Sequence, residues 1–170
     1  SKHALMSTLP NAEQLFQQLC QQIKPLIQEN TALIGIHSGG AWLMQRLLDT
    51  LTVQPVHGTL DVSFYRDDYL QRGLHHEPKP SNIAFDVQDR HIILIDDVFY
   101  TGRTIRAAMN ELFDYGRPAS ITLAVLINRG GQELPIAPQI CLHHMQVAQN
   151  QKIQLLQHAD GSFYLELEDC

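Results

Sequence analysis

The stretch HIILIDDVFYTGRT, residues 91–104, decides how this chain folds. His91–Ile95 is a short apolar run of the kind that forms a buried strand, and Asp96 and Asp97 end it. The letters that follow combine a glycine with hydroxyl and basic residues, as turns before a helix do. We therefore expect a strand, a turn and the start of a helix within these residues.

A second strand follows this helix at the spacing of a βαβ unit. The apolar residues predict a helix over Thr104–Tyr115, which Gly116 ends, and a strand over Ser120–Ile127. Parallel strands need a crossover of this kind, and the crossover is right-handed. The sequence therefore predicts an α/β fold built on an open, parallel sheet.

The same alternation of elements occurs earlier in the chain. A helix is expected from Asn11 onward, and it should end or kink at Pro25, which lacks a backbone donor. The next elements expected are a strand, a helix, a strand and a long loop, over Ala32–Ile36, Ala41–Leu51, Val56–Phe64 and Arg66–Asn82. Near the C-terminus we expect a β-hairpin formed by Gln151–Gln157 and Ser162–Glu168.

Composition restricts the class of protein. The 170 residues suffice for one well-buried core, and 12 basic against 18 acidic residues exclude a uniformly basic protein that coats nucleic acid. The three isolated cysteines argue against a disulfide framework or a thiolate zinc site, and they favour reduced thiols in the cytoplasm. No membrane span and no signal peptide are expected. Because a Met stands at position 6, we expect residues 1–5 to be a cloning remnant.

The turn after the strand is where a ligand is expected, because open α/β sheets bind ligands beyond the carboxyl ends of their strands. Gly102 allows a close approach of the backbone, and the hydroxyls of Thr101 and Thr104 suit a phosphate, as do the free N–H groups of a helix start. Asp96 and Asp97 would repel that phosphate, so they suit ribose hydroxyls, or Mg²⁺ bound through water. A sugar phosphate satisfies both halves of the turn. The alternative is that the two acids only begin a turn and cap a helix.

The segment ILIDDVFYTGRT resembles the phosphoribosyl pyrophosphate (PRPP) signature of type I phosphoribosyltransferases. With GIHSGG and GTLDVSFYRDD before it and LINRGGQELPI after it, the chain is similar to PyrR, a family of pyrimidine-operon regulators and uracil phosphoribosyltransferases. The resemblance covers Leu33–Ile140. It implies a type I phosphoribosyltransferase fold, with a central parallel sheet flanked by helices and a small hood that holds the base. It also implies a single phosphoribosyltransferase domain over residues 6–170.

The resemblance also implies roles for individual residues. Asp96 and Asp97 would bind the 2′ and 3′ hydroxyls of the ribose. The 5′-phosphate would be bound by Thr101, Gly102, Arg103 and Thr104, and the pyrophosphate by Ser38, Gly39 and Gly40. The implied reaction is uracil plus PRPP giving UMP and pyrophosphate. Mg²⁺ would be held by PRPP, with contacts to Asp96 and Asp97 through water and with no direct protein ligand.

Arg66 opens the long loop, which corresponds to the mobile catalytic loop of the family. We interpret this loop as a lid over PRPP, with Arg66 contacting the pyrophosphate and acting with Asp96 and Asp97 as the catalytic residues. A charged, solvated connector is the alternative. Displacement at the anomeric carbon passes through an oxocarbenium-like state, so stabilising the pyrophosphate and excluding water matter more than a protein nucleophile.

Two departures from the family bear on the substrates. His37 and Gly40 stand where many PyrR members place Lys and Arg in the pyrophosphate loop, so His37 is either a ligand contact or a packed or solvated histidine. Cys141–Gln149 lacks the Gly-Lys and Pro-Thr-Ser elements that line the uracil site in many members, so a purine or another base is the alternative to uracil. Tyr100 either stacks on the base or packs under the loop.

A third departure bears on regulation. Gly131 and Gln132 replace a His and an Arg of members that bind the messenger-RNA leader, which leaves Arg117 and Arg129 as the nearest bases. RNA affinity depends largely on Lys and Arg that neutralise phosphates, so RNA stays an open partner. The rival to an enzyme is a UMP- or PRPP-sensing regulator with little turnover that binds the pyr leader RNA or a protein partner. Family members form dimers or tetramers, so a homodimer or tetramer is implied here.

Overall fold

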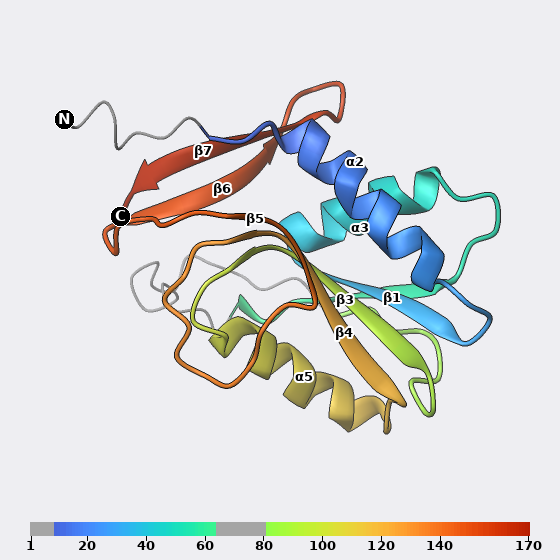
Figure 1. Cartoon of the computed structure of the whole chain (residues 1–170). Coiled ribbons are helices and arrows are strands. Elements are labelled where there is room, and N and C mark those ends of the chain that lie inside the picture. The colour runs from blue at the N-terminus through green and yellow to red at the C-terminus, as the bar shows by residue number, and fades with distance from the viewer. Residues whose placement is uncertain (1–8, 64–80) are drawn as a thin grey trace.

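A five-stranded parallel sheet lies at the centre of the computed structural model, which describes residues 9–63 and 81–170 (Figure 1). The strands lie in the order β2-β1-β3-β4-β5, and each neighbouring pair is parallel. They are β1 (Thr31–Ile36), β2 (Val56–Leu60), β3 (His91–Phe99), β4 (Ser120–Asn128) and β5 (Ile140–His144). The predicted α/β fold with a parallel sheet is confirmed.

Helices cover both faces of this sheet (Figure 1). In the described part of the chain they are α2 (Ala12–Ile23), α3 (Gly39–Asp49) and α5 (Arg103–Tyr115). Leu33 and Ile93 pack in one core with α2 and α3, whereas the next residue of each strand, Ile34 and Leu94, packs in a second core with α5. Burial on both faces explains why these strands are continuous apolar runs. None of the described helices is long and apolar enough to cross a membrane.

The first helix of the described residues, α2, begins and ends where the sequence predicts. The side-chain Oδ1 of Asn11 accepts a hydrogen bond from the N–H of Gln14 at 3.0 Å, which caps the helix. α2 ends at Ile23, and a 3-10 turn, η1 (Lys24–Leu26), follows it. Pro25 lies at the start of that turn, where its missing N–H is tolerated, so the predicted end at Pro25 is confirmed.

The C-terminal residues form a separate antiparallel hairpin of β6 (Gln151–Gln157) and β7 (Phe163–Asp169), as predicted. Figure 1 shows the hairpin beside α2. Its buried side chains, Ile153, Leu155 and Phe163, belong to the same core as α2 and α3. The hairpin is therefore packed against the sheet-and-helix body through apolar contacts.

The strand that carries the two acids is longer than predicted. The apolar run ends at Ile95, but β3 continues to Phe99 because β4 supplies backbone partners beyond that point, with Asp96 paired to Val125 and Phe99 to Asn128. The acids therefore lie inside a strand rather than in a turn. This extension fixes the backbone of both carboxylates within the sheet.

Other differences concern the ends of elements. α3 begins at Gly39, earlier than the predicted Ala41, and β2 ends at Leu60. β5 was not predicted, because its five residues include two histidines and a cysteine and form an edge strand. Residues 1–8 and 64–80 lie outside the described residues, so the expected remnant, the long loop up to Pro80 and its Arg66 are not described.

Candidate functional site

A cavity of about 460 Å³ lies where β3 ends and α5 begins. Its lining comes from Ser38 and Gly39 after β1, from the end of β3 through the start of α5, from Arg129, and from a wall at the hairpin. We call this the hairpin wall, formed by Gln149 and Gln151–Leu156. The cavity therefore brings the turn that the sequence singled out together with a hairpin from the far end of the chain.

The two acids, Asp96 and Asp97, both line the cavity. Oδ1 of Asp96 accepts the N–H of Asp97 at 2.9 Å, and Oδ1 of Asp97 accepts the N–H of Val98 at 2.8 Å. Asp96 is only 3% exposed, whereas Asp97 is half-buried. Each carboxylate is thus oriented by the backbone of the following residue, at the lining of the cavity.

The residues Thr101–Thr104, which we call the phosphate loop, connect β3 to α5. Gly102 has a φ of 98°, a left-handed conformation that favours glycine, and Oγ1 of Thr101 accepts the N–H of Arg103 at 3.2 Å. The backbone carbonyl of Thr101 accepts the N–H groups of Glu133 and Leu134 at 2.9 and 3.3 Å. The loop is therefore braced from behind, and the N–H groups of Thr104 and Ile105, which have no partner within the first turn of α5, lie where an anion is favoured.

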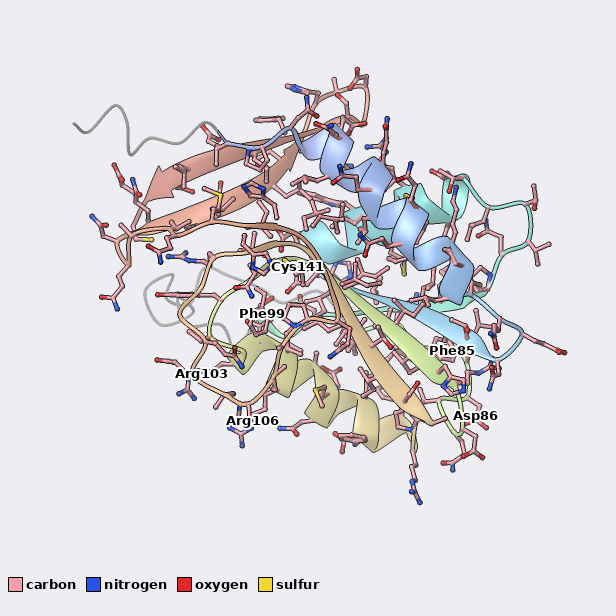
Figure 2. All side chains as sticks on the ribbon, viewed as in Figure 1. Phe85, Asp86, Phe99, Arg103, Arg106 and Cys141 are labelled. Carbon is pink, nitrogen blue, oxygen red and sulfur yellow. The ribbon has the colours of Figure 1, made fainter. Side chains whose placement is uncertain are left out.

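The side chain of Arg103 points away from the cavity. Figure 2 shows Arg103 and Arg106 at the start of α5, with both side chains directed outward. Nε of Arg103 pairs with Oε1 of Glu133 at 3.1 Å, and the two side chains are 46% and 52% exposed. Arg103 does not line the cavity, although its neighbours Gly102 and Thr104 do.

The predicted pyrophosphate loop, Ser38–Gly40, is split between two roles. Ser38 and Gly39 line the cavity, whereas a Cβ on Gly40 would overlap the carbonyl oxygen of Ile95. The backbone N–H of His37 donates to the carbonyl of Leu60 at 2.9 Å, and the peptide bond between His37 and Ser38 is cis. Gly40 therefore lets α3 pack against β3, and Ser38 and Gly39 face the ligand space.

The hairpin wall was missed by sequence reasoning, which predicted the hairpin but not its place. The alternating pattern of β6 indicates a strand with one buried face, and Ile153 and Leu155 are buried as that pattern requires. No local signal tells where such a hairpin docks. The hairpin wall includes the polar residues Gln149, Gln151, Lys152 and Gln154. Nε2 of Gln151 donates to Oδ1 of Asp169 at 3.3 Å, and Nζ of Lys152 pairs with Oε2 of Glu168 at 3.6 Å.

Tyr100 and Arg129 join the phosphate loop to the hairpin wall. The guanidinium carbon of Arg129 lies 3.9 Å from the centre of the Tyr100 ring, and a Cβ on Gly131 would come within 2.6 Å of Cε1 of that ring. Tyr100 thus packs between Arg129 and Gly131 and also lines the cavity. Arg129 is 6% exposed, so of the two nearest bases, Arg117 and Arg129, the second offers little surface to an RNA phosphate.

Comparison with known proteins identifies the family. The family described as "Phosphoribosyl transferase domain" matches residues 4–150. The chain belongs to this family. Relatives named "Bifunctional protein PyrR" include one from Nitrosococcus oceani, 48% identical over 152 residues with 85% of each chain covered. Another, from Pseudomonas fluorescens, is 45% identical over 166 residues and covers 95% of this chain and 98% of its own. The predicted membership of the PyrR family is confirmed, and with it the assignment as a phosphoribosyltransferase.

Solved structures agree with the fold. A hypoxanthine phosphoribosyltransferase from Staphylococcus aureus superposes with a TM-score of 0.62 at 16% identity, covering 90% of this chain and 84% of its own. A hypoxanthine-guanine-xanthine phosphoribosyltransferase gives a TM-score of 0.60 at 18% identity, covering 84% and 80%. At this identity the likeness concerns the fold alone, and it confirms the predicted type I phosphoribosyltransferase architecture.

Proposed function

We propose that this chain transfers the phosphoribosyl group of PRPP to uracil, giving UMP and pyrophosphate, in the cavity between the phosphate loop and the hairpin wall. The observation that carries the proposal is that Asp96 and Asp97, the phosphate loop and the hairpin wall line one cavity. A donor-rich loop for an anion, a pair of acceptors for a diol and a mixed polar wall for a base match the three parts of a nucleotide.

The proposed roles follow from the chemistry of each group. Asp96 and Asp97 accept hydrogen bonds from the 2′ and 3′ hydroxyls of the ribose, and the phosphate loop binds the 5′-phosphate through the N–H groups at the start of α5. Ser38 and Gly39 lie on the side where the pyrophosphate would leave, since α3 begins there. Gly40 supports this loop through its packing on β3 rather than by direct contact.

The reaction forms a bond between N1 of uracil and C1′ of the ribose, breaks the bond from C1′ to the pyrophosphate oxygen, and releases the proton of N1 to the pyrophosphate or to water. The residues of the cavity hold the sugar, exclude water and favour the cationic sugar that develops between these two events. The two carboxylates offer the oxygen donors that Mg²⁺ prefers, so the residues present fit the ion. Mg²⁺ bound to PRPP would supply positive charge to the leaving pyrophosphate.

Incubation of labelled uracil with PRPP and Mg²⁺, with UMP followed over time, tests this proposal. The same assay with hypoxanthine and guanine tests the base, because the solved relatives act on purines by their names. Formation of UMP alone is the expected result. Formation of a purine nucleotide alone would overturn uracil as the acceptor, and tight UMP binding without turnover of any base would favour the sensing regulator.

Regulation of pyrimidine genes is the second candidate function, because the relatives are named bifunctional. Arg117 is exposed, but Arg129 is not available to RNA. A shift assay with pyr leader RNA at several salt concentrations tests this function, since specific binding should survive near physiological salt. We also propose a single domain over residues 6–170, a homodimer or tetramer and a cytoplasmic location. The lid with its Arg66 stays a prediction outside the described residues.

A further inference from the structure

Arg129 makes contacts that a surface arginine does not make. It follows β4 directly, its backbone N–H donates to the carbonyl of Phe99 at 3.0 Å, and its side chain is almost fully buried. Nη1 donates to the carbonyl of Gln151 at 2.9 Å, and Nη2 donates to the carbonyls of Ala148 and Val147 at 2.9 and 3.4 Å. One side chain therefore holds the backbone that leads into β6.

The same guanidinium also contacts the part of the chain that leads into the phosphate loop. It stacks on Tyr100, which directly precedes the phosphate loop, with 3.9 Å between the guanidinium carbon and the ring centre. Gly131 allows the ring to lie there, since any side chain at Gly131 would meet it. Arg129 thus contacts the residue before the phosphate loop on one side and the start of the hairpin wall on the other.

The groups that surround the side chain of Arg129 suit a planar, charged hydrogen-bond donor. Within the described residues no carboxylate pairs with it, and its Nε is buried without a hydrogen-bond partner. Its charge is balanced by carbonyl dipoles and by the face of an aromatic ring. A lysine keeps the charge but cannot bridge two carbonyl groups in one plane while stacking on a ring. The geometry is therefore specific for arginine.

The opposite end of the hairpin has its own arginine. Arg46 pairs with both carboxylate oxygens of Glu13, at 2.5 and 3.0 Å, and packs against the rings of Phe16 and Phe163. Oε2 of Glu13 also accepts the N–H of Phe163 at the start of β7. None of these residues lines the cavity. Arg46 therefore anchors the hairpin without touching the ligand space, which makes it a matched control.

We propose that Arg129 is a positioning residue that sets the hairpin wall at the correct place relative to the phosphate loop, so that the base and the 5′-phosphate of one nucleotide are bound together. The inference rests on the proposed function for its ligand. It assigns to Arg129 a role in recognition of the base, exerted through the carbonyls of residues 148 and 151, and not in binding of the phosphate.

The test compares two ligands that differ by the base. Binding of UMP and of ribose 5-phosphate is measured by calorimetry with the wild-type chain and with Arg129→Met, Arg129→Lys and Arg46→Met. We expect Arg129→Met to weaken the binding of UMP about tenfold and the binding of ribose 5-phosphate less than about twofold. The reason is that charge-assisted contacts to the hairpin wall are lost. The affinity of Arg129→Lys for UMP should lie between the affinities of Arg129→Met and the wild type. Arg46→Met should lower thermal stability and leave the ratio of the two affinities unchanged.

Two results would overturn the inference. One is an equal loss of UMP and ribose 5-phosphate affinity in Arg129→Met, and the other is a selective loss of UMP in Arg46→Met. Should Arg129→Met fail to fold, Arg129→Lys gives the same comparison. A wild-type chain that binds UMP but converts no uracil would contradict the proposed enzyme activity. The role of Arg129 would still be tested by the ratio of the affinities for UMP and ribose 5-phosphate.

Discussion

Gly39 and Asp97 lie so close together that a Cβ added to Gly39 would be 2.7 Å from Cγ of Asp97. Gly39 is the first residue of α3 and Asp97 belongs to β3, so the contact joins the predicted pyrophosphate loop to the pair of acids. Both residues line the cavity. The absence of a side chain at Gly39 is therefore a condition for the position of the Asp97 carboxylate.

Gly39→Ala should displace this carboxylate and lower kcat/KM for PRPP by about tenfold or more, with an overpacking cost of about 1–3 kcal/mol in stability. Steady-state kinetics and thermal unfolding check both values. Gly161→Ala is the control, because Gly161 has a φ of 88° at the hairpin turn with nothing within 4 Å of an added Cβ. It should cost about 1 kcal/mol in stability without changing PRPP use. Normal PRPP kinetics in Gly39→Ala would refute the role of this contact.

Asp97→Asn should reduce PRPP affinity far more than it reduces stability. Asparagine keeps an oxygen that accepts the N–H of Val98, but it removes the charge, which is worth about ten- to a hundredfold in binding a diol or a metal-bound ligand. Calorimetry with PRPP and Mg²⁺, together with thermal unfolding, measures the two effects. Asp114→Asn, at an exposed position of α5, is the control. Equal losses of binding and stability in Asp97→Asn would mean that the carboxylate is architectural.

Arg103→Met should change PRPP use by less than about threefold. The guanidinium of Arg103 is paired with Glu133 on the surface, and exposed pairs contribute about 0–1 kcal/mol. We therefore assign phosphate binding to the backbone and hydroxyl groups of the phosphate loop, which the substitution retains. Steady-state kinetics at varied PRPP concentration gives the answer. A tenfold rise in KM for PRPP would show instead that the side chain turns inward onto the phosphate.

Glu13 should make stability depend on pH in the acid range. The hydrogen bond from Arg46 holds the pKa of Glu13 below its usual value of 4.5, with a smaller contribution from the backbone N–H of Phe163. A carboxyl with a lowered pKa stabilises the fold above its unfolded pKa, and this stabilisation is lost as pH falls through the folded value. The difference in unfolding free energy between wild type and Glu13→Gln should therefore be full at neutral pH and shrink below 4.5. A difference that does not vary with pH would contradict this assignment.

Much of the fold could be predicted from the sequence because its signals are local. The apolar runs of β1, β3 and β4 are buried on both faces, and the turn DDVFYTGRT carries its own glycine and hydroxyl groups. The acids and the phosphate loop were found together because they are neighbours in the chain. β3 extends beyond its apolar residues because its pairing with β4 continues to Phe99. Such pairing depends on the neighbouring strand, so it cannot be predicted from the sequence of β3 alone.

The hairpin wall could not be predicted, since it depends on contacts between distant residues. Arg129 reaches the carbonyls of Ala148 and Gln151, and Glu13 binds the backbone of Phe163. The sequence presents Arg129 only as a base in a polar loop. Its burial is decided by Tyr100, by Gly131 and by the place where the hairpin docks.

A crystal structure of the chain with UMP would show whether one nucleotide spans the phosphate loop and the hairpin wall. We predict the 5′-phosphate at the phosphate loop, within hydrogen-bond distance of the N–H groups of residues 101–104. We also predict the ribose hydroxyls on Asp96 and Asp97 and the base against the hairpin wall. A nucleotide seated elsewhere, with these residues empty, would contradict both the enzyme and the sensing regulator.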